Sequence, residues 1–258
     1  MPVLALDTSS SVAVAVVDDD GTLLAARSDD QPRHHAELLA PMVEAALAAA
    51  GVDRHALTAI VVGTGPAPFT GLRVGLVTAR TLGLALGIPV HGVPSLDAVA
   101  ATASRRLPAG TDVLVATDAR RREVYWSLYR LGGPGTVEVL VAPEVAAPAD
   151  VAADPRAAGA LVVGRGAALY PVLTGAGAPV EQLPVPGVTG APGILGMPGV
   201  GQEPAVVAPP VLDVDVDPAE LARLALDRTA AGQVLDSEPL YLRRPDAVPS
   251  AGGKRVLG

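Results

Sequence analysis

Apolar and polar positions along the first hundred residues alternate between short strand patterns and longer helical ones. The stretches VLALD, VAVAVV and TLLAAR predict three strands, the last two joined by a hairpin turn at Asp18–Gly21. Apolar residues recur at helical spacing over 34–51, where Pro41 interrupts the pattern, and again over 70–87. With strands at 57–63 and 89–93 and a helix over 95–107 capped by Ser95, the predicted order is βββαβαβα.

The same pattern starts again near residue 112. Three strands are predicted, at DVLVATD, in the stretch after it and at TVEVLVA. A further strand, a glycine turn and the start of a helix are predicted at ALVVGRG, and a late helix capped by Asp217 is predicted at 220–232. Asp7 and Asp118 end the first strand of each half, and Gly63-x-Gly65 matches Gly164-x-Gly166. We therefore expect two duplicated α/β lobes, 1–107 and 108–235, with a Pro/Gly-rich insert at 184–210 and a tail at 236–258.

Composition narrows the function classes. Half of the 258 residues are apolar but only 2% are aromatic, so an aliphatic core is expected. The absence of cysteine excludes a disulfide scaffold, cysteine-ligated zinc and thiol catalysis. The net charge of −8 argues against a stand-alone nucleic-acid binder, and arginine runs such as Arg120–Arg122 are interpreted as solvated faces. No signal peptide or membrane span is predicted, so we expect a cytoplasmic protein.

The loop VVGTGPAPFTGLRVG resembles a phosphate-binding turn without matching one. It lacks the lysine of a Walker loop, and Phe69 stands where a dinucleotide fingerprint has its third glycine. Pro66 and Pro68 remove two backbone donors that could bind phosphate. We interpret the loop as a tight turn that starts a helix.

Small residues follow one side of that helix at intervals of four. Gly71, Gly75, Ala79 and Gly83 form a ridge, although each helical glycine costs about 0.5–1 kcal/mol relative to alanine. Such a ridge suits the close approach of another helix. The sequence leaves open whether that helix is the chain's own first helix or belongs to another chain.

Asp7, Thr8 and Ser9 form a candidate vestigial phosphate loop. A strand-end aspartate followed by Thr or Ser and a hairpin is typical of the magnesium-side phosphate loop of actin-like kinases. That loop has a glycine soon after the aspartate, and this chain has serines instead. The alternative is that Asp7 hydrogen-bonds its own turn. The four histidines show no metal-binding spacing, and no catalytic set stands out.

Four segments together resemble a known family. They are LALDTSSSVAVAVV, RHHAELLAPMVEAAL, GTGPAPFTGLRVGLVTARTLGLALGIPVHGVPSLDAVA and EPLYLRRPDA. They are similar to the bacterial TsaB (YeaZ) family of tRNA threonylcarbamoyladenosine biosynthesis proteins. The resemblance is dense over about the first 105 residues, looser in the middle, and returns at 238–247. Ala67-Pro68 depart from the Gly-Ser common in the family, and the Pro/Gly-rich insert has no counterpart there.

This resemblance implies a two-lobed actin-like fold of the sugar-kinase (ASKHA) class. It also implies a non-catalytic subunit that pairs with a related catalytic subunit, TsaD. That complex includes the ATPase TsaE and modifies adenosine 37 of tRNA. It uses ATP and threonylcarbamoyl-adenylate. No cofactor or metal is expected on this chain itself, and tRNA would be met only through the complex.

The resemblance also implies where the partner binds. The His-x-x-x-His metal motif of the catalytic subunit corresponds here to Ser95 and Val99, which cannot replace imidazole ligands. The first two helices of the first lobe would contact the same helices of the partner, or of a second copy in a homodimer. A stand-alone actin-like ATPase or small-molecule kinase is the alternative, and a peptidase is disfavoured because no nucleophile or metal set is present. The expected contact residues are Leu39, Met42, Gly71, Leu72, Gly75, Leu76, Ala79 and Gly83.

Overall fold

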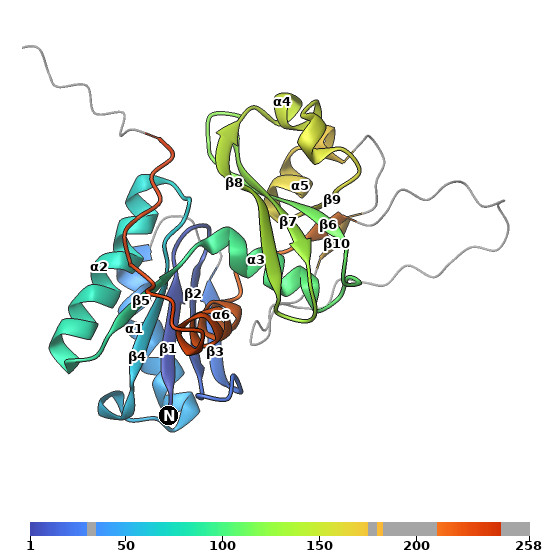
Figure 1. Ribbon diagram of the computed structural model, residues 1–258. Coiled ribbons are helices and arrows are strands. Elements are labelled where there is room, and N and C mark those ends of the chain that lie inside the picture. Colours follow the sequence, from blue (N-terminus) through green and yellow to red (C-terminus); the bar gives the residue numbers. More distant parts are fainter. Residues whose placement is uncertain (30–34, 175–179, 183–210, 244–258) are drawn as a thin grey trace, which may run out of the picture.

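The computed structural model describes residues 1–29, 35–174, 180–182 and 211–243. It consists of two lobes, each built on one β-sheet, with helices on both faces of the sheets (Figure 1). Within these described ranges, no helix has the length and apolar character needed to cross a membrane. The predicted insert at 184–210 lies outside them, as do His34 and the chain after residue 243.

The first lobe contains a five-stranded sheet in the order β3-β2-β1-β4-β5. β1 pairs antiparallel with β2 and parallel with β4, and every residue of these three strands is buried. Helices α1 and α2 cover one face, where they enclose an aliphatic core with Leu4, Leu6, Ile60 and Val62. The elements are β1 (Val3–Asp7), β2 (Val12–Val17), β3 (Leu23–Asp29), α1 (His35–Ala50), η1 (Arg54–Ala56), β4 (Ala59–Gly63), α2 (Phe69–Leu86) and β5 (Val90–Val93).

The second lobe repeats this topology. Its sheet has the order β10-β11-β9-β6-β7-β8, in which β6 pairs antiparallel with β7 and parallel with β9, as β1 does with β2 and β4. The duplication predicted from Asp7/Asp118 and the two Gly-x-Gly turns therefore appears in the strand order itself. The elements are β6 (Asp112–Asp118), β7 (Val124–Leu131), β8 (Val137–Ala146), α4 (Pro148–Ala152), η2 (Pro155–Ala157), β9 (Leu161–Val163), α5 (Arg165–Leu169), η3 (Pro171–Leu173), β10 (Val180–Gln182) and β11 (Val211–Asp213).

Two further helices, α3 (Ser95–Ser104) and α6 (Pro218–Ala230), lie between the lobes (Figure 1). One continuous apolar core contains both helices together with residues of β1 and of β6 and β7. α6 packs on the first sheet, although it follows the strands of the second sheet in the sequence. The lobe boundaries at 107 and 235 therefore remain a prediction. Because both sheets share this core, the lobes are joined by packing as well as by the chain.

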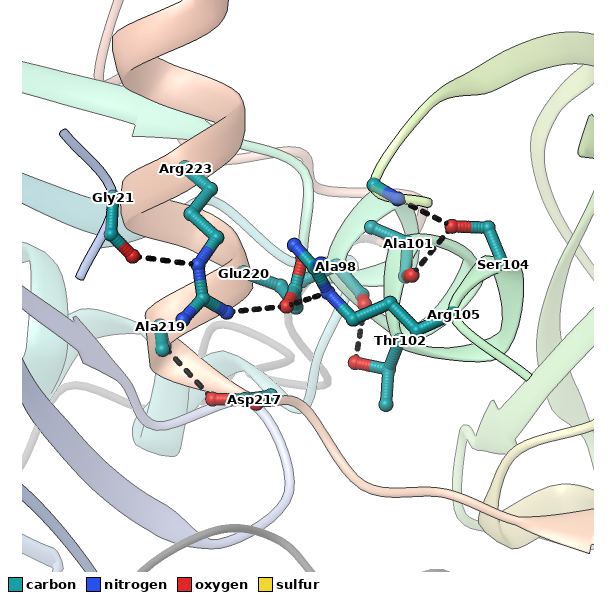
Figure 2. A network of polar contacts seen from close by, with 11 residues as sticks. Gly21, Ala98, Ala101, Thr102, Ser104, Arg105, Asp217, Ala219, Glu220 and Arg223 are labelled. Atoms are coloured by element: carbon teal, nitrogen blue, oxygen red, sulfur yellow. Dashed lines mark hydrogen bonds and ion pairs between the residues drawn. The ribbon is translucent and has the colours of Figure 1, made fainter. Parts of the chain in front are cut away.

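An ion cluster ties the same elements together at the surface. Glu220 of α6 is 1% exposed and accepts from Arg105 at the end of α3 (2.5 and 3.0 Å) and from Arg223 (2.5 Å). Arg223 also donates to the Gly21 carbonyl in the β2–β3 turn (2.9 Å), and Asp217 caps α6 through the Ala219 N–H (Figure 2). A buried carboxylate with two arginine partners is satisfied here, and removing it would leave two cations facing each other.

Several local expectations are corrected by the structure. Ser95 is not the side-chain cap of α3: Pro94 occupies the N-cap position, and the Ser95 hydroxyl turns toward β1 instead. Pro41 lies inside α1, with its ring on the exposed side. The short elements η1, α4, η2, η3, β10 and β11 had no periodic signal long enough to predict them. Asp217 caps α6 as predicted.

Candidate functional site

The turn after β1 is closed around the Asp7 carboxylate, which is 1% exposed. Ser9 donates its backbone N–H (2.7 Å) and its hydroxyl (2.5 Å) to Asp7 Oδ1, and Ser95 donates its hydroxyl to Oδ2 (2.6 Å). Burial raises the pKa of Asp7, while the serine hydrogen bonds act in the opposite direction. The interpretation that Asp7 hydrogen-bonds its own turn is thus confirmed, and the Ser95 contact is added from 88 positions away.

Thr8 joins this turn to α2. Its hydroxyl donates to the Gly71 carbonyl (2.7 Å) and accepts from the Gly75 N–H (3.0 Å). A Cβ on Gly75 would lie 2.5 Å from the Thr8 hydroxyl, so only glycine allows this approach. Gly83 likewise lies against Val90 of β5, so this side of α2 packs on the sheet. The sequence had left open whether the ridge meets α1 or another chain.

Gly63, the last residue of β4, makes room for the buried carboxylate. A Cβ on Gly63 would lie 1.8 Å from Asp7 Oδ2 and 2.7 Å from the Ser95 hydroxyl. Gly65 has φ +87° and donates its N–H to the Ser95 hydroxyl (3.2 Å). The interpretation of the loop as a tight structural turn is therefore confirmed. The Gly65 N–H and the Ser95 hydroxyl at this turn hydrogen-bond to other residues of the chain.

A cavity of about 190 Å³ lies between the lobes above this turn. Ser10 and Arg165, which line it, both contact the Asp215 carboxylate: Ser10 donates to it, and Arg165 pairs with it at 3.5 Å. The lining residues are Ser9, Ser10, Pro66, Pro68, Ser95, Leu96, Thr117, Asp118, Arg120, Arg165, Leu169 and Val216.

The actin-like resemblance implies a nucleotide in such a cleft, and the residues present do not fit one. Pockets that enclose small molecules commonly have about 300–1,000 Å³, more than this cavity offers. Asp7, the residue that would face a magnesium–phosphate group, is absent from the lining and accepts three hydrogen bonds within its own lobe. Within the described ranges, no three His, Cys, Asp or Glu side chains gather as a metal site.

The residues expected to contact a partner lie on α1 and α2, mostly on their inner sides. Leu39, Leu72, Leu76 and Ala79 are at most 4% exposed and pack in the first-lobe core, and Met42 packs against it. Gly75 and Gly83 are buried too, and Gly71 is half-buried. These residues set how the two helices lie on the sheet, and their role in partner binding remains a prediction.

The outer side of the same helices carries large exposed apolar side chains beside polar ones such as Arg73 and Arg80. Val77 and Leu84 of α2 are 62% and 86% exposed. α1, which contacts α2, presents mainly alanine on its exposed positions, together with Glu37 and Glu44. We call this surface the α1/α2 face. Large apolar side chains exposed on a helix, with polar residues around them, are typical of a protein–protein contact.

The segment after α6 runs along the edge of the first sheet and beside α2 (Figure 1). Leu235 accepts from the Gly92 N–H (3.1 Å), and Leu240 donates to the Thr64 carbonyl (2.9 Å). Arg80 of α2 donates to the Ser237 carbonyl (2.7 Å). The Tyr241 ring lies 5.1 Å from that of Phe69. We call residues 233–243 the C-terminal strap.

Comparisons with known proteins place the chain in a family. A family model described as TsaD, tRNA N6-adenosine threonylcarbamoyltransferase, matches residues 25–170. An uncharacterized protein of Mycobacterium tuberculosis is 40% identical over 251 residues, which cover 96% of this chain and 95% of that protein. The tRNA threonylcarbamoyladenosine biosynthesis protein TsaB of Escherichia coli is 35% identical over 150 residues, 56% of this chain and 64% of TsaB. YeaZ from Pseudomonas aeruginosa superposes with a TM-score of 0.67 at 29% identity, over 93% of this chain and all of YeaZ.

The chain belongs to the TsaB/YeaZ family. The two-lobed actin-like fold predicted from the sequence is confirmed by the shared topology of the two sheets and by the superposition on YeaZ. The aligned stretch spans just under two thirds of E. coli TsaB, and the chain spans 56% of a longer Mycobacterium leprae relative.

Two features of this TsaB/YeaZ member were missed in the sequence. Ser95 was assigned to a helix cap, but its hydroxyl serves Asp7 and Gly65 across the lobe. The bridge from Ser10 to Asp215 joins residues 205 positions apart. Local patterns carry no signal for such long-range pairs. The Asp-x-Ser spacing at Asp7 did indicate the local turn.

Proposed function

We propose that this chain is a non-catalytic subunit of a tRNA threonylcarbamoyladenosine-synthesising complex. In that complex it would support a TsaD-type subunit, which transfers the threonylcarbamoyl group to N6 of adenosine 37. The observation that carries the proposal is that Ser95 and Val99 have structural roles in this chain. The family resemblance puts the metal-binding histidines of the catalytic subunit at these two positions. The Ser95 hydroxyl donates to Asp7 and accepts from Gly65, and Val99 is 0% exposed.

The α1/α2 face is the surface that we assign to the TsaD-type partner. Val77 and Leu84 supply exposed apolar side chains on α2. The buried residues predicted as contacts, such as Leu72 and Gly75, support this role by holding α2 close to the sheet. TsaE and tRNA would join through the assembled complex, and a homodimer through the same face is the competing use of this surface.

Size-exclusion chromatography with light scattering tests the proposal. The chain is run alone and with the TsaD subunit of the same organism, as wild type and as the double variant Val77→Glu/Leu84→Glu. Two charges placed in an apolar contact are expected to weaken a one-to-one complex by about 100-fold or more. Because both side chains are exposed, the variant should keep its circular dichroism spectrum and melting temperature.

Val172→Glu is the matched control, since Val172 is also an exposed apolar residue (53%) but lies in the second lobe. Loss of the complex with both variants would show a general effect of charge. A wild-type chain that forms no complex with TsaD would overturn the proposal, and ATP hydrolysis by the isolated chain would then favour the kinase-like alternative. A complex that survives the double variant would move the contact to another surface.

A further inference from the structure

The turn between β6 and β7 holds three consecutive arginines in a backbone conformation that side chains disfavour. Arg120, Arg121 and Arg122 have φ of +61°, +55° and +61°. For residues with a Cβ this left-handed region is strained, and turns that need it ordinarily contain glycine or asparagine. Strain of this kind persists where surrounding structure imposes it, and it concentrates at functional sites. We call these three residues the arginine tip.

The arginine tip is held from both sides. Two backbone hydrogen bonds close the turn. The Ala119 N–H donates to the Glu123 carbonyl (2.9 Å), and the Glu123 N–H donates to the Arg120 carbonyl (3.0 Å). Asp118 accepts from the Arg120 N–H and guanidinium (both 2.9 Å). From the C-terminal strap, Arg243 donates to the Ala119 carbonyl (3.1 Å) and pairs with Glu123. The backbone is therefore fixed while the three arginine side chains stay exposed.

The position and charge of the arginine tip point to an anionic ligand. The whole chain carries a net charge of −8, yet this turn places three consecutive positive charges between Asp118, which pairs with Arg120, and Glu123, which pairs with Arg243. Arg120 and Arg165 both line the cleft between the lobes, where they pair with Asp118 and Asp215. Guanidinium groups bind phosphate oxygens through a planar pair of donors.

We propose that the arginine tip binds the phosphate backbone of RNA. The inference rests on the proposed function, in which the assembled complex acts on tRNA, and it adds a contact made by this chain. The acidic remainder of the surface would repel RNA and confine the contact to the tip. Two or three phosphates are too few for a stand-alone RNA binder, but they add to the affinity of a complex whose other subunit holds the tRNA.

The test measures binding of an unmodified tRNA transcript to the complex of this chain with the TsaD subunit, at several salt concentrations. In Arg121→Glu/Arg122→Glu, loss of two phosphate contacts reduces the magnitude of the slope of log K against log salt by about 1.4–1.8. It should weaken binding about tenfold or more near 0.1 M salt. Arg121→Lys/Arg122→Lys keeps the charges and should recover most of the slope. Arg54→Glu, an exposed arginine at the opposite end of the first sheet, should bind within twofold of wild type.

Each result has one meaning. A double-glutamate variant that forms the complex but binds tRNA with unchanged affinity and salt slope overturns the inference and leaves the proposed function standing. A variant that loses TsaD assigns the tip to a protein contact, which also overturns it. If weaker binding is seen for inorganic tripolyphosphate but not for tRNA, the tip serves a small phosphate compound and the RNA inference fails. If the wild-type chain forms no complex, both proposals fall.

Discussion

The turns after β1 and after β6 occupy equivalent places in the two lobes but present different surfaces. In each, an aspartate ends the strand and accepts the N–H of the residue two positions later, from Ser9 to Asp7 and from Arg120 to Asp118. The Asp7 residue is 1% exposed, whereas 23% of the Asp118 side chain is exposed. One backbone arrangement thus supports a closed, self-satisfied turn in the first lobe and an open, cationic turn in the second.

The matched glycines show how this difference arises. Gly63 leaves space that the Asp7 carboxylate fills, so the first turn folds inward over the sheet. Gly164 and Gly166 instead lie against the backbone of Ala116, where a Cβ would come within 2.5 and 2.8 Å of its atoms. In the second lobe the space left by these glycines is taken by the backbone of β6, and the Asp118 side chain stays partly exposed. Equivalent residues in a duplicated fold can therefore serve different packing needs, and function cannot be copied from one lobe to the other.

The largest effect is expected from Gly63→Ala. The added Cβ would overlap Asp7 Oδ2, so the carboxylate or the strand must move, at a cost of about 3 kcal/mol in the free energy of unfolding. Urea denaturation measures it. Gly133→Ala is the control because a Cβ there meets nothing within 4 Å, and its change should stay within about 0.5 kcal/mol. Equal effects of the two would mean that the first turn is not tightly closed.

Removing a hydroxyl partner from each aspartate compares the two turns directly. Ser95→Ala leaves a buried carboxylate oxygen and the Gly65 N–H without their partner, which should cost about 2 kcal/mol. Tyr170→Phe removes a 3.2 Å hydrogen bond to Asp118, which water can replace, and should cost less than about 0.5 kcal/mol. Equal losses on thermal or urea unfolding would contradict the contrast between closed and open turns.

Strain in the second turn predicts a change of opposite sign. Arg121→Gly permits a φ of +55° at little steric cost, so the free energy of unfolding should rise by about 0.5–1 kcal/mol while tRNA binding by the complex weakens. Arg122→Ala keeps a Cβ at φ +61° and should change stability little. A glycine variant that is less stable than wild type would show that the arginine side chain, and not the backbone, holds this turn.

The smallest expected effect is in the pH dependence of stability. Because the folded-state pKa of Asp7 is raised by burial, its contribution to stability is present below the ordinary aspartate pKa of about 3.9 and is lost as pH rises through the raised value. Asp7→Asn removes this contribution. Its unfolding free energy relative to wild type should therefore increase from pH 4 to pH 8 in urea titrations. A difference between Asp7→Asn and wild type that stays constant with pH would contradict this expectation.

Periodicity predicted the elements of the first lobe because its strands and helices are long and strongly patterned. The duplication was visible because strand-end residues such as Asp7 and Asp118 carry the same chemistry in both halves. The packing of α6 on the first sheet was not predictable, since an amphipathic pattern says which side is buried but not against what. The same limit applied to α2, whose glycine ridge indicated a close approach but not that β1 and β5 provide it.

The candidate site was predictable only where its contacts are local. Ser9 binds Asp7 two positions away, and this spacing is a known turn signal. The Ser95 contact depends on how two strands are placed next to each other in the folded sheet. The arginine tip was interpreted as a solvated face because nothing in three consecutive arginines predicts positive φ. Only the folded turn shows that conformation.

The C-terminal strap also closes the open side of β5, the last strand of the first sheet. Its approach is close: a Cβ on Gly92 would lie 2.2 Å from the Asp236 carbonyl. A protein cut before residue 233 would bare the N–H and C=O groups along this strand, and such edges pair readily with one another. Shortened versions of the chain would then self-associate through β5, and in a sizing experiment this artefact would look like a dimer formed by the α1/α2 face.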